Sequence, residues 1–203
     1  MRNLAGLLPL LTFALLFFSV LACVLIVDDK ESIFNNEISR YGEYPGAQYI
    51  IFSIGFTLAS FSFFLTAYAR HKLLFHPFCN SNVKKFISYL CLFLAFLQIP
   101  TTIIMAFSNG LRSGVHRVFA VLSWAFIAVY VIESALLLIW ITFFNLTWFL
   151  FSFTNILLAS ASIVLLSIWN SADMELLEWL GVFFILAVLI VYSFELFYEA
   201  MED

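Results

Sequence analysis

Six long apolar runs, separated by short polar segments, make up almost the whole chain. The runs cover residues 4–27, 49–68, 86–107, 118–141, 148–169 and 179–198. Because about 20 apolar residues in a helix cross the hydrocarbon core of a bilayer, each run is long enough to span a membrane once. The pattern therefore predicts an all-α, polytopic membrane protein, in which residues 1–203 form a single bundle of six transmembrane helices.

The composition supports this prediction and excludes several classes of protein. Hydrophobic residues make up 64% of the chain and charged residues 11%, whereas a soluble domain is about half apolar and a quarter charged. The nine Lys and Arg residues are scattered, so we expect no nucleic-acid partner. No cofactor-binding motif and no cluster of metal ligands stands out, so we expect neither a cofactor nor a metal.

The distribution of basic residues predicts how the bundle is oriented. The segment between the second and third runs carries Arg70, Lys72, Lys84 and Lys85 and no acid. The excess of Lys and Arg in cytoplasmic loops places this segment in the cytoplasm, and an even number of spans then places both termini there. We expect the four basic residues to meet anionic lipid headgroups, at about 1 kcal/mol each.

The three cysteines do not suggest a disulfide framework, because their number is odd and two of them lie in apolar runs. Cys79 differs from the others, since it lies in the basic segment near the predicted cytoplasmic boundary. It is therefore a candidate for reversible palmitoylation, and an ordinary loop thiol is the alternative.

Two carboxylates lie within apolar runs. Glu133, in the fourth run, is expensive to place in hydrocarbon and is a candidate for ion- or proton-linked transport or for ligand contact. The alternative is a structural carboxyl that hydrogen-bonds across helices to Gln98, Asn155 or a serine. Glu195 lies close to the end of the sixth run, where we expect its carboxylate to reach the interface.

A histidine and a glutamate begin two of the apolar runs on the predicted lumenal side. His116 precedes the fourth run and Glu178 precedes the sixth. If these helices are adjacent, the pair is able to act as a general base and its orienting acid. The alternative is that the two side chains only tie helix ends together, because no Gly-x-Ser-x-Gly or other nucleophile motif accompanies them.

Three sequence features resemble one known family. Residues 38–45 read Ile-Ser-Arg-Tyr-Gly-Glu-Tyr-Pro, with Ser39, Gly42 and Pro45 spaced as in that family's motif before its second span. Val115-His116 opens the fourth run, and Glu178-Trp179 opens the sixth. In these features the chain resembles the DRAM/Frag/Sfk family of six-span eukaryotic membrane proteins. It departs from the family where Pro45-Gly46 replaces Pro-Pro and where the connection between the fourth and fifth runs is short.

The resemblance implies an integral protein of the endomembrane system (Golgi, endoplasmic reticulum or lysosome) or of the plasma membrane. Its leading functional implication is a non-enzymatic modulator of autophagy, trafficking or membrane-lipid organisation, with membrane lipids or trafficking proteins as partners. A second is lipid remodelling of GPI-anchored substrates, with the chain as the acyl-transfer catalyst or its partner and with His116 and Glu178 at a lumenal site. Ser39, Gly42, Pro45 and Trp179 form a family-like lumenal motif. A small transporter that uses Glu133 remains a third hypothesis.

Overall fold

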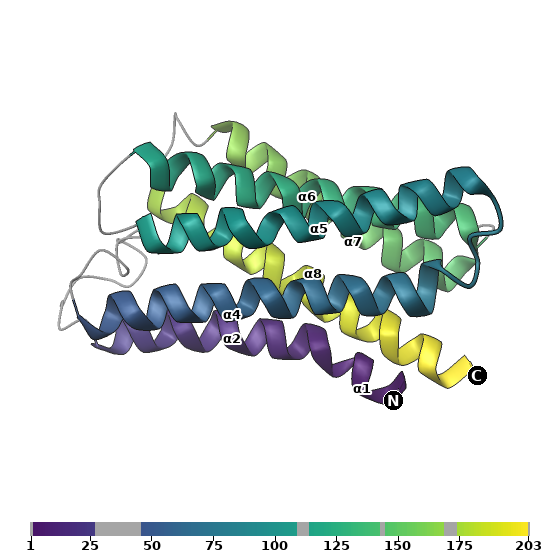
Figure 1. The fold of residues 1–203 in the computed structure, drawn as a ribbon, viewed down its shortest axis with the longest axis horizontal. Coiled ribbons are helices and arrows are strands. Elements are labelled where there is room, and N and C mark those ends of the chain that lie inside the picture. Colours follow the sequence, from purple (N-terminus) through teal and green to yellow (C-terminus); the bar gives the residue numbers. More distant parts are fainter. Residues whose placement is uncertain (1, 27–45, 109–113, 143–144, 169–173, 203) are drawn as a thin grey trace.

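The computed structural model describes residues 2–26, 46–108, 114–142, 145–168 and 174–202, and all of the regular structure in these ranges is helical (Figure 1). The elements in chain order are α1 (Arg2–Ala5), α2 (Leu7–Ile26), α4 (Ala47–Arg70), the π-helical turn η2 (His71–Phe75), α5 (Asn82–Ser108), α6 (Gly114–Ile141), α7 (Leu146–Ile168) and α8 (Met174–Glu202). Six helices in the described ranges are long and apolar enough to cross a membrane. The prediction of an all-α chain with six such helices is confirmed.

The helices form a ring in chain order. Each of the six long helices packs against the next one along the chain, and α8 returns to pack against α2. The two ends of the chain lie at the same end of the bundle, together with the connection between η2 and α5 (Figure 1). We call this the terminal end of the bundle, and the other the distal end.

The helix that contains the second apolar run extends past residue 68, the end predicted for that run. The helix continues through Arg70 and then through η2 to Phe75, so that residues 76–81 alone connect it to α5. The reason is apolar burial: Leu74 and Phe75 are each 1% exposed and belong to a core cluster near the terminal end. The basic residues of this segment therefore begin on a helix rather than in a loop.

A glycine allows α2 and α4 to approach each other closely. A Cβ atom added to Gly55 would overlap the side chain of Ser19. Further along the same interface, Thr12 Oγ1 donates a hydrogen bond to Ser62 Oγ at 2.8 Å. Small residues with hydroxyl contacts are the usual means by which membrane helices pack.

We predict that Gly55→Leu destabilises the bundle, because the added side chain must push α2 away from α4. The expected loss is about 1–3 kcal/mol of unfolding free energy, measured by reversible unfolding in mixed micelles. Gly114→Leu is the matched control, since a Cβ atom there meets nothing within 4 Å. Equal losses in the two variants would contradict the close approach at Gly55.

Candidate functional site

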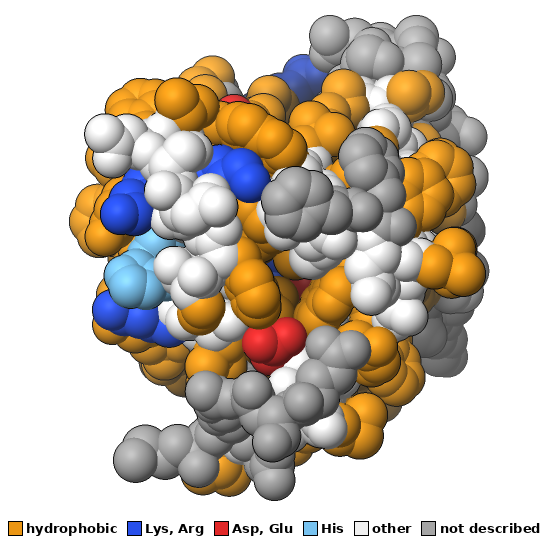
Figure 2. All heavy atoms as spheres, turned by 90° about the vertical axis from the view of Figure 1, so that its right-hand side faces the viewer, with side chains coloured by type: hydrophobic (Ala, Val, Ile, Leu, Met, Phe, Trp, Pro, Cys, Tyr) orange, Lys and Arg blue, Asp and Glu red, His pale blue; other side chains and the backbone are white. Residues whose placement is uncertain are grey.

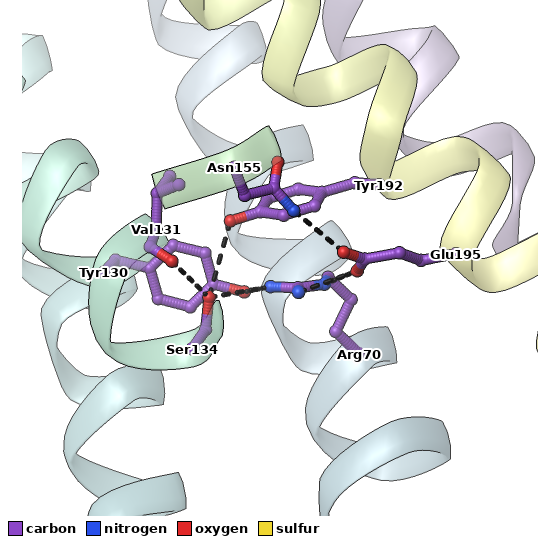
Figure 3. Close-up of polar contacts among 7 residues, drawn as sticks. All are labelled: Arg70, Tyr130, Val131, Ser134, Asn155, Tyr192 and Glu195. Carbon is purple, nitrogen blue, oxygen red and sulfur yellow. Dashed lines mark hydrogen bonds and ion pairs between the residues drawn. The ribbon is translucent and has the colours of Figure 1, made fainter. Parts of the chain in front are cut away.

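A fully buried ion pair joins α4 to α8 (Figure 3). Arg70 and Glu195 are both 0% exposed. Arg70 Nε donates to Glu195 Oε2 at 2.9 Å, and Arg70 Nη2 lies 2.7 Å from the same oxygen. Since an unpaired charge inside an apolar bundle is expensive, each side chain requires the other.

Two further helices add hydrogen bonds to this pair. From α6, Tyr130 Oη and Ser134 Oγ each accept a bond from Arg70 Nη1 at 3.0 Å. From α7, Asn155 Nδ2 donates to Glu195 Oε1 at 2.8 Å. Figure 3 shows these side chains converging from four helices on one point. We call these five residues the polar cluster.

Aromatic rings enclose the guanidinium group. The Arg70 Cζ atom lies 3.7 Å from the centroid of the Tyr192 ring and 5.4 Å from that of Phe75, which belongs to η2. A planar guanidinium stacks on a ring while its edge donates several hydrogen bonds, whereas a lysine ammonium does not. The position therefore requires arginine in particular.

The interfacial roles predicted for Arg70 and Glu195 are wrong. We expected Arg70 to meet lipid headgroups and Glu195 to reach the interface, but both are withdrawn from the surface and neutralise each other. Lys84 also faces the protein, since it is 7% exposed and its Nζ lies 5.1 Å from the centroid of the Trp140 ring. The sequence signal that could have revealed the pairing of Arg70 with Glu195 is their opposite charge at the terminal ends of two predicted spans.

The terminal end still presents basic residues. Figure 2 shows this end, where Lys and Arg side chains gather toward one edge beside a histidine. Lys72 and Lys85 are exposed, and their contact with lipid headgroups stays a prediction.

Cys79, in the connection between η2 and α5, is 4% exposed and packs in the same core cluster as Leu74 and Phe75. Burial raises the pKa of its thiol, and the neighbouring Lys84 and Lys85 only partly offset this effect. The reactive form of a cysteine is the thiolate, and burial disfavours it. Acylation of Cys79 therefore requires the connection between η2 and α5 to expose the thiol. Its palmitoylation stays a prediction.

Glu133 does not join the polar cluster. It is half-buried, and its Oε2 atom has no hydrogen-bond partner among the described residues. The two residues proposed as its partners bond elsewhere: Asn155 to Glu195, and Gln98 to Thr102. In the described part of the structure, Glu133 therefore does not pair with Asn155 or Gln98.

A cavity of about 120 Å³ occupies the distal half of the bundle, between α2, α4, α5, α6 and α8. Its lining is mostly apolar, but one wall is polar. On this wall Gln98 Nε2 donates to Thr102 Oγ1 at 2.6 Å, and Thr102 Oγ1 lies 2.6 Å from Ser123 Oγ. Gln98 is 4% exposed, and its Oε1 atom has no partner among the described residues. A buried carbonyl left unsatisfied costs about 1–3 kcal/mol.

His116 also lines this cavity, near the distal start of α6. Its Nδ1 atom lies 2.8 Å from the carbonyl oxygen of Met105. Because a carbonyl only accepts, Nδ1 carries a hydrogen and donates it, which holds the ring in place. The side chain of Glu178 is outside the described part of the structure, so its pairing with His116 stays a prediction.

Of the lumenal motif, Ser39, Gly42 and Pro45 lie outside the described residues. Trp179 is 9% exposed and packs in a core cluster with Val20 and Phe52. The tryptophan therefore serves the packing of the distal end.

The polar cluster lies between two cavities. The second, of about 300 Å³, is at the terminal end, where Leu74, Leu138 and Glu199 contribute to its lining. Along α4 and η2, the distal cavity reaches to Phe63 and the terminal cavity begins at Leu74, about three helical turns further. Arg70 lies within this interval, as Tyr130 and Ser134 do on α6.

Comparisons with known proteins identify no relative of this chain. No protein-family model, no curated protein and no solved structure matches it. Among the described residues, no group of three or more His, Cys, Asp or Glu side chains is placed to hold a metal ion.

We predict that breaking the ion pair on one side is far more damaging than removing it whole. Arg70→Met leaves the Glu195 carboxylate buried and unpaired, at an expected loss of about 3–5 kcal/mol of unfolding free energy. Adding Glu195→Met to that variant should recover part of the loss, as measured by unfolding in mixed micelles. Losses that simply add in the double variant would show that the two side chains are not coupled.

Proposed function

We propose that this chain is a multi-pass endomembrane protein of the DRAM/Frag/Sfk type, which organises membrane lipid without catalysis by holding a lipid in its distal cavity. The observation that carries the proposal is this cavity, which is mostly apolar and surrounded by five helices. An apolar cavity of about 150 Å³ accommodates benzene. A cavity of about 120 Å³ therefore suits one ring, or the end of an acyl chain, of a bound lipid.

The distribution of charge supports a cytoplasmic terminal end. Among the described residues, Lys72 and Lys85 are exposed at this end and Arg117 at the distal end, and cytoplasmic segments carry the excess of basic residues. The distal cavity then belongs to the lumenal half of the membrane, and His116 lies near its lumenal end.

Several contacts favour lipid binding over the remodelling of GPI anchors. A catalytic histidine activates a nucleophile to which it is hydrogen-bonded. The Nδ1 atom of His116 donates to a backbone carbonyl, which leaves Nε2 as the atom that would act as a base. The hydroxyls of Thr102 and Ser123, which line the same cavity, bond to each other. Catalysis would thus depend on a nucleophile and an orienting acid outside these contacts.

The transporter hypothesis depends on Glu133 and loses support. Glu133 lines neither the distal nor the terminal cavity. The polar cluster also fills the interval between these cavities with bonded side chains. A continuous path would require that cluster to open.

We predict that the wild-type protein, purified in mild detergent, retains lipid and that Ala59→Leu loses most of it. Ala59 is 2% exposed and lines the distal cavity, so a larger side chain there takes the space of the lipid. Native mass spectrometry measures the bound fraction.

Ala47→Leu is the matched control, since Ala47 is exposed on the same helix. Absence of lipid from the wild type, or equal retention by the two variants, would refute lipid binding in this cavity.

A further inference from the structure

We infer that the distal cavity selects an uncharged lipid that carries a hydrogen-bond donor, a hydroxyl or an amide N–H, and that Gln98 Oε1 accepts its hydrogen. This inference rests on the proposed function, because it names the chemical class of the lipid that the cavity holds. It depends on three features of the cavity: an unsatisfied acceptor, the absence of charge from the lining, and flat aromatic walls.

The acceptor is the amide oxygen of Gln98. The nitrogen of the same amide is already bonded to Thr102, which in turn is bonded to Ser123. These bonds anchor the amide on the cavity wall. The Oε1 atom, at the end of this series of hydrogen bonds, is buried and has no partner among the described residues. Inside a membrane there is little water to satisfy such an oxygen, so a hydrogen-bond donor on the ligand would remove the free-energy cost of leaving it unpaired.

The lining excludes a charged headgroup. Among the described residues that line the distal cavity there is no Lys, Arg, Asp or Glu. Arg70 and Glu195 lie beyond Phe63 in the polar cluster, where they neutralise each other. His116 is the one titratable side chain among the described lining residues. A phosphate or an ammonium group would therefore be buried without a permanently charged partner, which is unfavourable.

Aromatic side chains give the cavity flat walls. Phe56, Phe63 and Trp124 line it, and Trp124 is seated against Gly181, where a Cβ atom would overlap its ring. Such walls suit the hydroxyl-bearing ring of a sterol or the hydroxyl and amide end of a ceramide. The cavity is partly open, so the rest of either lipid extends beyond it.

The test uses the full-length protein in phosphatidylcholine nanodiscs and photoreactive lipids whose site of labelling is read by peptide mass spectrometry. One probe is a diazirine cholesterol, and its partner is the same molecule with the hydroxyl converted to a methyl ether, which accepts but does not donate. A diazirine ceramide and a diazirine phosphatidic acid complete the set. Whichever alcohol labels the cavity more strongly identifies the source of the donor.

We expect at least one of the two alcohols to label residues of the distal cavity well above phosphatidic acid. For the sterol pair, the alcohol should exceed the ether by about fivefold, the change expected of one hydrogen bond. If the ceramide is the alcohol that labels the cavity, the same ratio should be seen against an added probe, a diazirine ceramide methylated at its hydroxyls and amide nitrogen. The ratio applies only to an alcohol that labels the cavity. Gln98→Met, which keeps the length of the side chain but removes the acceptor, should bring the ratio close to one. Gln48→Met, outside the cavity, should leave the ratio unchanged.

Each contrary result has a distinct meaning. If no probe labels the cavity, the proposed function fails together with the inference. If an ether labels as strongly as its alcohol in the wild type, or phosphatidic acid labels best, the cavity binds lipid but the inferred class is wrong. The ratio of labelling by the alcohol to labelling by its ether is measured on the wild-type protein, so the test remains decisive even if Gln98→Met folds poorly.

Discussion

The ion pair between Arg70 and Glu195 is the contact on which the rest of the bundle depends. Neither charge is tolerable alone at a fully buried position, so α4 and α8 must bring the two side chains together. The remaining donors and acceptors of the pair then recruit α6 and α7 through Tyr130, Ser134 and Asn155. One electrostatic requirement thereby determines how four of the six helices are rotated and at what depth they meet.

This requirement divides the bundle into two halves with different properties. On the terminal side, the cluster is backed by the packed residues of η2, including Phe75. On the distal side the helices enclose a cavity with one polar wall, which ends at Phe63, short of the cluster. The cluster thus closes the cavity from the terminal side, and the cavity is left as a place for a ligand rather than a passage across the membrane.

The number and type of the helices could be predicted from the sequence, because the length of an apolar run needed to cross a bilayer is a local property. The partners of the polar residues could not. Arg70 follows an apolar run and was interpreted as its boundary, since an exposed cation and a paired one look alike in sequence. Its partner is 125 positions away. Gln98 and Asn155 stand out as polar residues in apolar runs, but only the rotation of their helices assigns Asn155 to Glu195 and Gln98 to the cavity. Glu133, the most conspicuous acid within the apolar runs, bonds to neither Gln98 nor Asn155.

The central claim is that the polar cluster closes one end of a cavity that holds a lipid. An experimental structure of the wild-type protein in nanodiscs of native lipid tests it most directly. The account predicts non-protein density in the distal cavity, in contact with Gln98 and ending at Phe63, with Arg70 and Glu195 still paired beyond it. A collapsed or empty cavity, or density that continues between Arg70 and Glu195 toward the terminal end, would contradict it.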